Sequence, residues 1–213
     1  MKTLRLVPLF LAAAISAYAG VHVVGGEKSK VDTLPWWGLV PNMRFQCCWY
    51  QKEINEAGLV TKIEIQFDRY GRGTPPSYFP NCKILLCHTS LSKLKEYFDL
   101  NYDGRTPVEV FNGTFVVPED LVPGQWFSLD IKPKFRYNNK LNLLLEVIYF
   151  GGSGAENVFW ISETGQPGFL YTLTPESEHK GSLSLDCGYV AKIHIGYTGL
   201  APASLGRVKA LYY

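Results

Sequence analysis

The sequence predicts an all-β protein, a two-sheet β-sandwich of the jelly-roll type with extended N- and C-terminal arms. Many short segments alternate apolar and polar residues with a period of two, which is typical of half-buried strands. Clusters rich in glycine and proline separate these segments at short intervals. Only residues 90–98 have the apolar spacing of a helix. Many short strands, separated by turns and accompanied by one minor helix, favour two packed sheets.

About ten strands are expected along the chain. The first three are residues 44–50 (RFQCCWY), 62–67 (KIEIQF) and 83–88 (KILLCH), of which 62–67 alternates charged and apolar residues most regularly. The segment after them, Ser90–Phe98, places Leu91, Leu94 and Phe98 on one face and is predicted to be the minor helix.

The remaining strands follow the same logic. Residues 108–111 and 113–117 flank Asn112-Gly113, a dipeptide that predicts a tight hairpin turn. Residues 141–149 are almost continuously apolar, which indicates a central strand covered on both faces. The other expected strands are residues 126–131, 158–161, 169–173 and 189–195.

The first nineteen residues are predicted to be a cleavable secretory signal. Lys2 and Arg5 provide the positive start, residues 6–17 are largely apolar, and Ala17-Tyr18-Ala19 has the small-x-small pattern of a cleavage site. The apolar stretch is shorter than the ~20 residues that span a bilayer. The protein is therefore expected to be secreted, extracellular or at the cell surface, without a membrane span.

The sandwich is expected to occupy residues 38–196, between an N-terminal arm (20–37) and a C-terminal arm (197–213). Each arm has a strand-competent end. The residues concerned are Val21, Val23 and Val24 in one arm and Val208, Leu211 and Tyr213 in the other. Two interpretations stay open: the arms are edge strands of the same domain, or an arm pairs with the exposed sheet edge of a neighbouring subunit.

Charge excludes one class of partner. The chain has 21 basic and 19 acidic residues. Loss of Lys2 and Arg5 with the signal leaves 19 of each, a net charge near zero. A basic surface for nucleic acid is therefore not expected.

Five cysteines remain after the signal: Cys47, Cys48, Cys82, Cys87 and Cys187. They are disulfide candidates in an oxidising compartment, but buried free thiols are an equally open interpretation. The adjacent Cys47 and Cys48 point to opposite faces of a strand. The spacings lack the paired CxxC motifs of a structural zinc site.

One motif suggests a metal. Asp99, Asn101 and Asp103 lie in DLNYDG, which matches the first half of a calcium-binding loop. The twelfth position is Val110 instead of a bidentate glutamate, and Asp, Asn and Gly are also ordinary turn residues. Calcium is thus a possible ligand, and no cofactor is required.

Aromatic side chains suggest a second kind of ligand. Trp36, Trp37 and Trp160 lie in or near expected loops and could stack on sugar rings. The aromatic content of 14% is also what fills the core of a thick β-sandwich.

No catalytic constellation is recognised. The four histidines have no metal-ligand spacing, and Ser153 lies in a glycine-rich turn without the GxSxG pattern of a nucleophile elbow. The protein is therefore not expected to be an enzyme.

Residues 44–67, 83–94, 101–118 and 124–149 together resemble an accessory β-sandwich module of secreted bacterial proteins. Such modules are appended to exported hydrolases and surface proteins, often with C-terminal sorting regions like those of type IX secretion. The resemblance implies an accessory or adhesive role and brings no catalytic residues.

These observations predict a non-enzymatic extracellular structural protein, a surface or filament subunit that assembles into a homopolymer by β-strand exchange through a terminal arm. The alternative is a monomeric adhesin module that binds a carbohydrate or another surface group, such as a cell-surface glycan.

Overall fold

The computed structural model describes residues 20–26, 28, 30–32, 39–67, 77–154, 159–162 and 165–197; for residues 30–32 and 160 it describes the backbone only. The strands in these ranges are β1 (Gly20–Val24), β2 (Lys30–Asp32), β3 (Asn42–Trp49), β4 (Gly58–Gln66), β5 (Ser77–Thr89), β6 (Val108–Val117), β7 (Trp126–Tyr137), β8 (Asn142–Phe150), β9 (Phe159–Ser162), β10 (Phe169–Thr172), β11 (Ser182–Ser184), β12 (Gly188–Tyr189) and β13 (Ala191–Gly196). The helical elements are the one-turn helix α1 (Gln51–Ile54) and the 3₁₀ helix η1 (Phe98–Tyr102).

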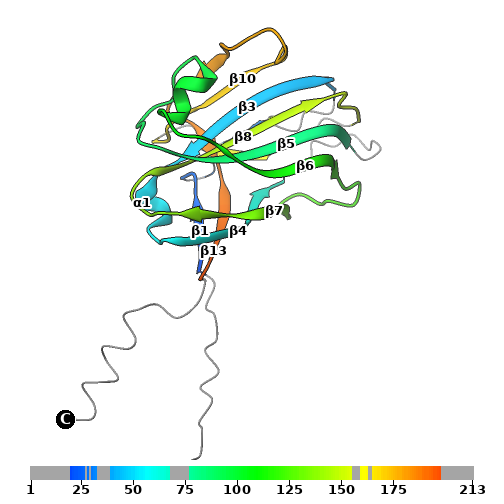
Figure 1. Cartoon of the computed structure of the whole chain (residues 1–213). Coiled ribbons are helices and arrows are strands. Elements are labelled where there is room, and N and C mark those ends of the chain that lie inside the picture. Colours follow the sequence, from blue (N-terminus) through cyan, green and yellow to red (C-terminus); the bar gives the residue numbers. More distant parts are fainter. Residues whose placement is uncertain are drawn as a thin grey trace, which may run out of the picture.

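Two antiparallel sheets pack face to face (Figure 1). The smaller has the strand order β1-β13-β4-β7, and the larger has the order β11-β10-β3-β8-β5-β6. A third, short sheet has the order β12-β9-β2. The predicted all-β sandwich is confirmed.

The strand pairing identifies the sandwich as a jelly roll. Four antiparallel pairs are nested along the chain: β5 with β6, β4 with β7, β3 with β8, and β1 with β13. Successive pairs lie alternately in the larger and the smaller sheet. The wrapping brings β8 beside β5 and β13 beside β4, which joins the paired strands into two open sheets. This is a long antiparallel ribbon wound into two layers, as in other jelly rolls.

Strand β8 lies between β3 and β5 and is covered on both faces. Its inward residues Leu143, Leu145 and Val147 belong to the main core between the sheets. Leu144 belongs to a second cluster on the outer face, with Cys48, Cys87, Leu94, Phe98 and Leu170. The segment around η1 covers that face (Figure 1). The continuous apolar run predicted a strand covered on both faces, and this is confirmed.

The helix predicted over Ser90–Phe98 is wrong. Most of this segment has no regular structure, and η1 begins only at Phe98. The backbone groups bond outside the segment: the N–H of Phe98 donates to the carbonyl of His179 (3.1 Å), and the carbonyl of Glu96 accepts from the N–H of Gly181 (2.9 Å). The predicted apolar stripe is partly right, since Leu94 and Phe98 are buried.

The hairpin turn predicted at Asn112-Gly113 is also wrong. Strand β6 runs without a break through both residues, and these face Lys83 and Cys82 of β5. Two register irregularities between β5 and β6 accommodate the extra residues. Pairing with the 13-residue strand β5 therefore overrides the local turn preference.

Candidate functional site

The three residues proposed for calcium are engaged separately. Asp99 pairs with Arg44 (Oδ1 to Nη2, 3.2 Å), and Asp103 accepts hydrogen bonds from Ser90 and Arg105. Asn101 is fully buried and bonds both backbone polar groups of Lys95, at 2.8 and 3.0 Å. The described residues contain no group of three or more His, Cys, Asp or Glu side chains that could hold a metal ion.

The five cysteines are buried, and the structure places none of them in a disulfide. Cys47 lies in the main core and Cys48 in the outer cluster, on opposite faces of β3 as predicted. Cys48 and Cys87 share the outer cluster but both lie opposite Leu144, one on each side of β8. Two strand spacings, roughly 9–10 Å, separate their backbones, which exceeds the reach of a disulfide.

Other predicted residues lie outside the described part of the chain. These are the leader (1–19), Trp36 and Trp37, the side chain of Trp160, and Val208, Leu211 and Tyr213. The three valines of the N-terminal arm (Val21, Val23 and Val24) lie in strand β1. This strand pairs with β13 of the same chain. Strand β1 thus lies at the edge of the smaller sheet of its own chain, which agrees with the first of the two interpretations of the N-terminal arm.

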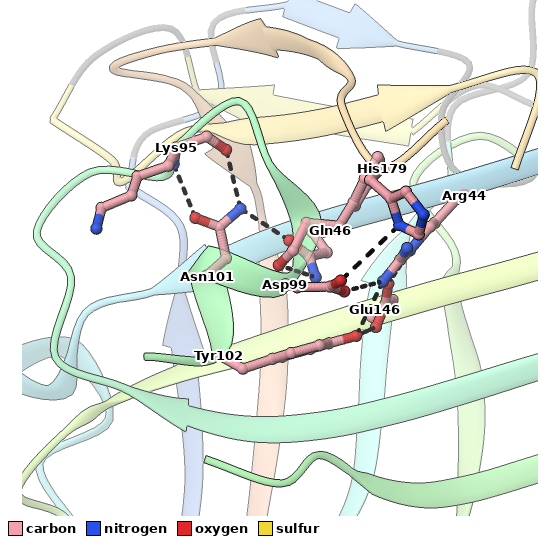
Figure 2. Close-up of polar contacts among 9 residues, drawn as sticks. Arg44, Gln46, Lys95, Asp99, Asn101, Tyr102, Glu146 and His179 are labelled. Atoms are coloured by element: carbon pink, nitrogen blue, oxygen red, sulfur yellow. Dashed lines mark hydrogen bonds and ion pairs between the residues drawn. The ribbon is translucent and has the colours of Figure 1, made fainter. Parts of the chain in front are cut away.

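A polar cluster lies on the outer face of the larger sheet (Figure 2). Arg44 on β3 donates from Nε to Glu146 on β8 at 2.5 Å, and its Nη2 donates to the hydroxyl of Tyr102 in η1 at 3.2 Å. Tyr102 in turn donates to the other oxygen of Glu146. The three residues thus connect two strands of the sheet to the η1 segment.

A buried amide pair extends this cluster (Figure 2). Asn101 donates from Nδ2 to Oε1 of Gln46 at 2.9 Å, and Gln46 donates from Nε2 to the carbonyl of Phe98 at 3.2 Å. Both amide side chains are fully buried. Each therefore replaces the water that it loses on folding with protein partners.

Burial acts on both partners of the Arg44–Glu146 pair: it raises the pKa of Glu146, and the attraction of Arg44 and the hydrogen bond from Tyr102 oppose that rise. The side chain of Glu146 is 1% exposed and that of Arg44 is 12% exposed. Burial disfavours the charged guanidinium and so lowers the pKa of Arg44. The attraction of the Glu146 carboxylate is stronger than this effect, and the pKa of Arg44 lies above its ordinary value. The carboxylate is shielded and receives its hydrogen bonds from within the protein. Its evident role is to hold η1 on the sheet.

Sequence reasoning did not identify this cluster, although one signal was present. Glu146 is the single charged residue in the apolar run 141–149, which was expected to be covered on both faces. A carboxylate in such a strand requires a cationic or hydrogen-bonding partner. The sequence offers no indication that the partner is Arg44, which lies 102 positions away.

A second polar cluster lies on the outer face of the smaller sheet. Glu64 on β4 bonds Lys62 (2.8 Å), Ser128 on β7 (3.1 Å) and His194 on β13 (2.7 Å). Burial disfavours the ionised carboxyl and raises its pKa, but the hydrogen bonds from Lys62 and His194 have a larger effect in the opposite direction. They lower the pKa of Glu64 from 4.5 to about 2.

Glu64→Gln should lower the free energy of unfolding at pH 7 by about 1–2 kcal/mol, because the amide cannot replace the charge. A carboxyl with a lowered folded-state pKa stabilises the fold above its ordinary pKa of 4.5. That contribution disappears as the pH falls towards 2. Urea unfolding at pH 7, 4 and 2.5 should therefore show the two proteins converging in stability. Glu109→Gln, at an exposed ion pair with Lys83, is the matched control and should change little.

The free edge of β1 is the third feature. Of the described residues, only those of β13 pair with β1 in a sheet. On the outer face, Val21 is 50% exposed and Val23 is 60% exposed, opposite His194 and Lys192 respectively. The side chain of His22 bonds Glu56, which also accepts from the hydroxyl of Tyr197. This contact holds the start of β1 beside the end of β13.

The other edges of the two large sheets carry features that discourage further pairing. Strand β7 presents exposed charged residues and Pro133. Strand β6 has two register irregularities, and β11 is only three residues long. Charges, proline, bulges and short length are the devices by which natural sheets protect their edges. Strand β1 (GVHVV) carries no proline or bulge, and its only ionisable side chain bonds Glu56.

Comparison with known proteins adds little. No family model matches the sequence, and no curated protein matches it. Among solved structures, the chain is similar to one described as "Structure of infectious bursal disease virus Gt strain", with 9% identity and a TM-score of 0.19. The match covers 99% of this chain and 51% of that chain, so this chain spans about half the length of the viral chain. A likeness at this level carries no conclusion about function.

In the described ranges, no helix combines the length and the apolar character needed to cross a bilayer.

Proposed function

We propose that this chain is a non-enzymatic extracellular structural protein, a surface or filament subunit whose copies join by β-strand pairing at the free edge of β1. The observation that carries the proposal is the contrast between β1 and the other sheet edges. Strand β1 exposes Val21 and Val23, and of the described residues only those of β13 pair with it in a sheet. The other edges are charged, bulged or short. An unprotected edge of this kind is a template for an added strand.

The donor strand in this proposal is the C-terminal segment 207–213 (RVKALYY) of a neighbouring copy. Its alternation of apolar and polar residues at 208–210 suits a strand. Strand β13 ends at Gly196, and Ile195 lies opposite Gly20 at the start of β1. The ten residues 197–206 can extend at most roughly 35 Å, which is enough to reach an adjacent subunit.

The double variant Val21→Glu, Val23→Glu should weaken assembly and leave the subunit folded. Charges at the free edge oppose an incoming strand. Glutamate also keeps β1 in its own sheet, because the new carboxylates lie opposite His194 and Lys192. The mature chain starting at Gly20 is examined by sedimentation velocity and negative-stain microscopy, and the fold by circular dichroism. Association should weaken by at least about tenfold, equivalent to 1.4 kcal/mol.

Val122→Glu is the matched control. Val122 is 60% exposed, like Val23, but lies in the loop before β7. This variant should assemble like the parent. A parent chain that stays monomeric at high concentration contradicts the proposal. So does a double variant that assembles as well as the parent.

A further inference from the structure

The carboxylate of Glu56 lies where the first and the last described strands meet. Glu56 is in the loop between α1 and β4, and it bonds the ring of His22 on β1. It also accepts a hydrogen bond from the hydroxyl of Tyr197, the residue after β13. The two strands lie side by side, with Gly20 opposite Ile195 (Figure 1). Three segments that are distant in sequence therefore meet at this carboxylate.

Gly20 brings the backbone of β1 against the same carboxylate. A Cβ atom at this position would collide with Oε2 of Glu56. Gly20 is not among the residues with a positive φ, so the close approach is what favours glycine here. Since the backbone bonds are ~1.5 Å long, the nitrogen of Gly20 lies within roughly 4–5 Å of this oxygen. At that distance opposite charges attract each other strongly.

Glu56 can accept a cationic partner. Its side chain is 18% exposed, and its ion-pair partner among the described residues is a histidine instead of a lysine or arginine. Burial raises the pKa of Glu56, but the hydrogen bonds from Tyr197 and His22 have a larger opposite effect, so the pKa lies below its ordinary value. The group is therefore ionised at neutral pH. Two donors do not saturate a carboxylate, which has about four acceptor sites.

Removal of the predicted leader creates a suitable cation. Hydrolysis of the Ala19–Gly20 peptide bond consumes one water molecule, releases the leader with a carboxylate at Ala19, and leaves an α-amine on Gly20. This amine is largely protonated at pH 7, because the ordinary pKa of an α-amino group is about 7.7–8.0. In the uncleaved chain the same nitrogen is a neutral amide.

We propose that Glu56 is the docking site for the α-ammonium group of Gly20 in the mature chain. The ion pair fastens the first residue of β1 to the loop between α1 and β4, beside the contacts that His22 and Tyr197 already make. Leader removal thereby strengthens the attachment of β1 to its own sheet. The proposal rests on the predicted cleavage after Ala19, and it does not depend on whether β1 pairs with another subunit.

The first test compares a chain that starts at Gly20 with one that starts at Ala17. The two have the same net charge, but the ammonium of the longer chain is displaced by three residues. In urea at micromolar concentration and pH 7, the chain that starts at Gly20 should have an unfolding equilibrium constant about fivefold smaller. With Glu56→Gln the two chains should differ by less than about twofold. Glu176→Gln, which removes an exposed carboxylate bonded to Asn42, is the matched control and should preserve the difference.

The pH dependence has a defined sign. The folded-state pKa of the α-amine is expected to lie above its unfolded value, because the carboxylate of Glu56 favours the charged form. The stabilisation is therefore present at pH 7 and is lost as the pH rises through the raised pKa.

The second test measures the α-amine itself. The chain that starts at Gly20 is labelled with trace acetic anhydride over about pH 6–10. Mass spectrometry of the tryptic peptide 20–28 then gives the pH dependence of labelling. The pKa of the amine should lie clearly above about 7.7–8.0 and return to this range in Glu56→Gln.

The proposal fails if the chains that start at Gly20 and Ala17 are equally stable at pH 7. It also fails if the α-amine has its ordinary pKa, or if Glu56→Gln leaves that pKa unchanged. Mass spectrometry of the secreted protein tests the premise, and a first residue other than Gly20 would overturn the proposal. None of these results bears on the pairing of β1 between subunits.

Discussion

Arg44→Met should lower the free energy of unfolding by about 3–5 kcal/mol, because it leaves the carboxylate of Glu146 buried without its cation. The loss should affect the η1 segment first, since Tyr102 and Asp99 also bond Arg44. Urea unfolding followed by tryptophan fluorescence measures the change. Hydrogen exchange should show η1 losing protection before the strands of the larger sheet.

The double variant Arg44→Met, Glu146→Leu is the informative control. Removing both charges eliminates the unpaired carboxylate, so the double variant should be more stable than Arg44→Met alone. Arg44→Lys should fall between the parent and Arg44→Met, because lysine keeps the charge but cannot bond Glu146 and Tyr102 in the same way. If Arg44→Met costs less than about 1 kcal/mol, the ion pair does not hold this layer together.

Trp49→Ala should destabilise the sandwich by a similar amount, about 3–5 kcal/mol. Trp49 is fully buried in the main core and donates from Nε1 to the carbonyl of Tyr189 at 2.7 Å. The variant therefore creates a large cavity and also leaves a buried carbonyl without its donor. The midpoint of chemical or thermal unfolding measures the effect.

Trp49→Phe separates the two contributions, because it keeps much of the buried ring and loses only the donor. It should cost clearly less than Trp49→Ala. Trp126→Phe is a second control: Trp126 lies on the outer face at the edge strand β7, where the ammonium of Lys192 lies 4.1 Å from its ring centre. Equal effects of the two changes at Trp49 would mean that the hydrogen bond, not the cavity, dominates there.

The sequence predicted those parts of the fold that depend on local patterns. The alternation at 62–67 and the apolar run at 141–149 follow directly from which faces of a strand are buried, and they match β4 and β8 to within one residue at one end. The failures at 90–98 and at Asn112-Gly113 have a common cause. In both cases a partner distant in sequence, the 179–181 segment or β5, takes the backbone hydrogen bonds that local preference would have used.

The candidate sites were less predictable. Glu146 was visible as a charge in a buried strand, but its partner Arg44 becomes a neighbour only through the pairing of β3 with β8. The free edge of β1 depends on the strand order of the whole sheet, although Val21 and Val23 were identified as strand-competent.

The position of β13 has a consequence for the order of folding. Among the described residues this is the last strand, and it lies between β1 and β4, which precede it by more than 100 positions. Until residues 191–196 are available, β1 has no partner in this sheet, and β4 has only β7. Formation of the smaller sheet therefore waits until β13 is available, and contacts so distant in sequence make folding slow. A chain interrupted before Ala191 would expose two unpaired strand edges and should be captured by chaperones or aggregate.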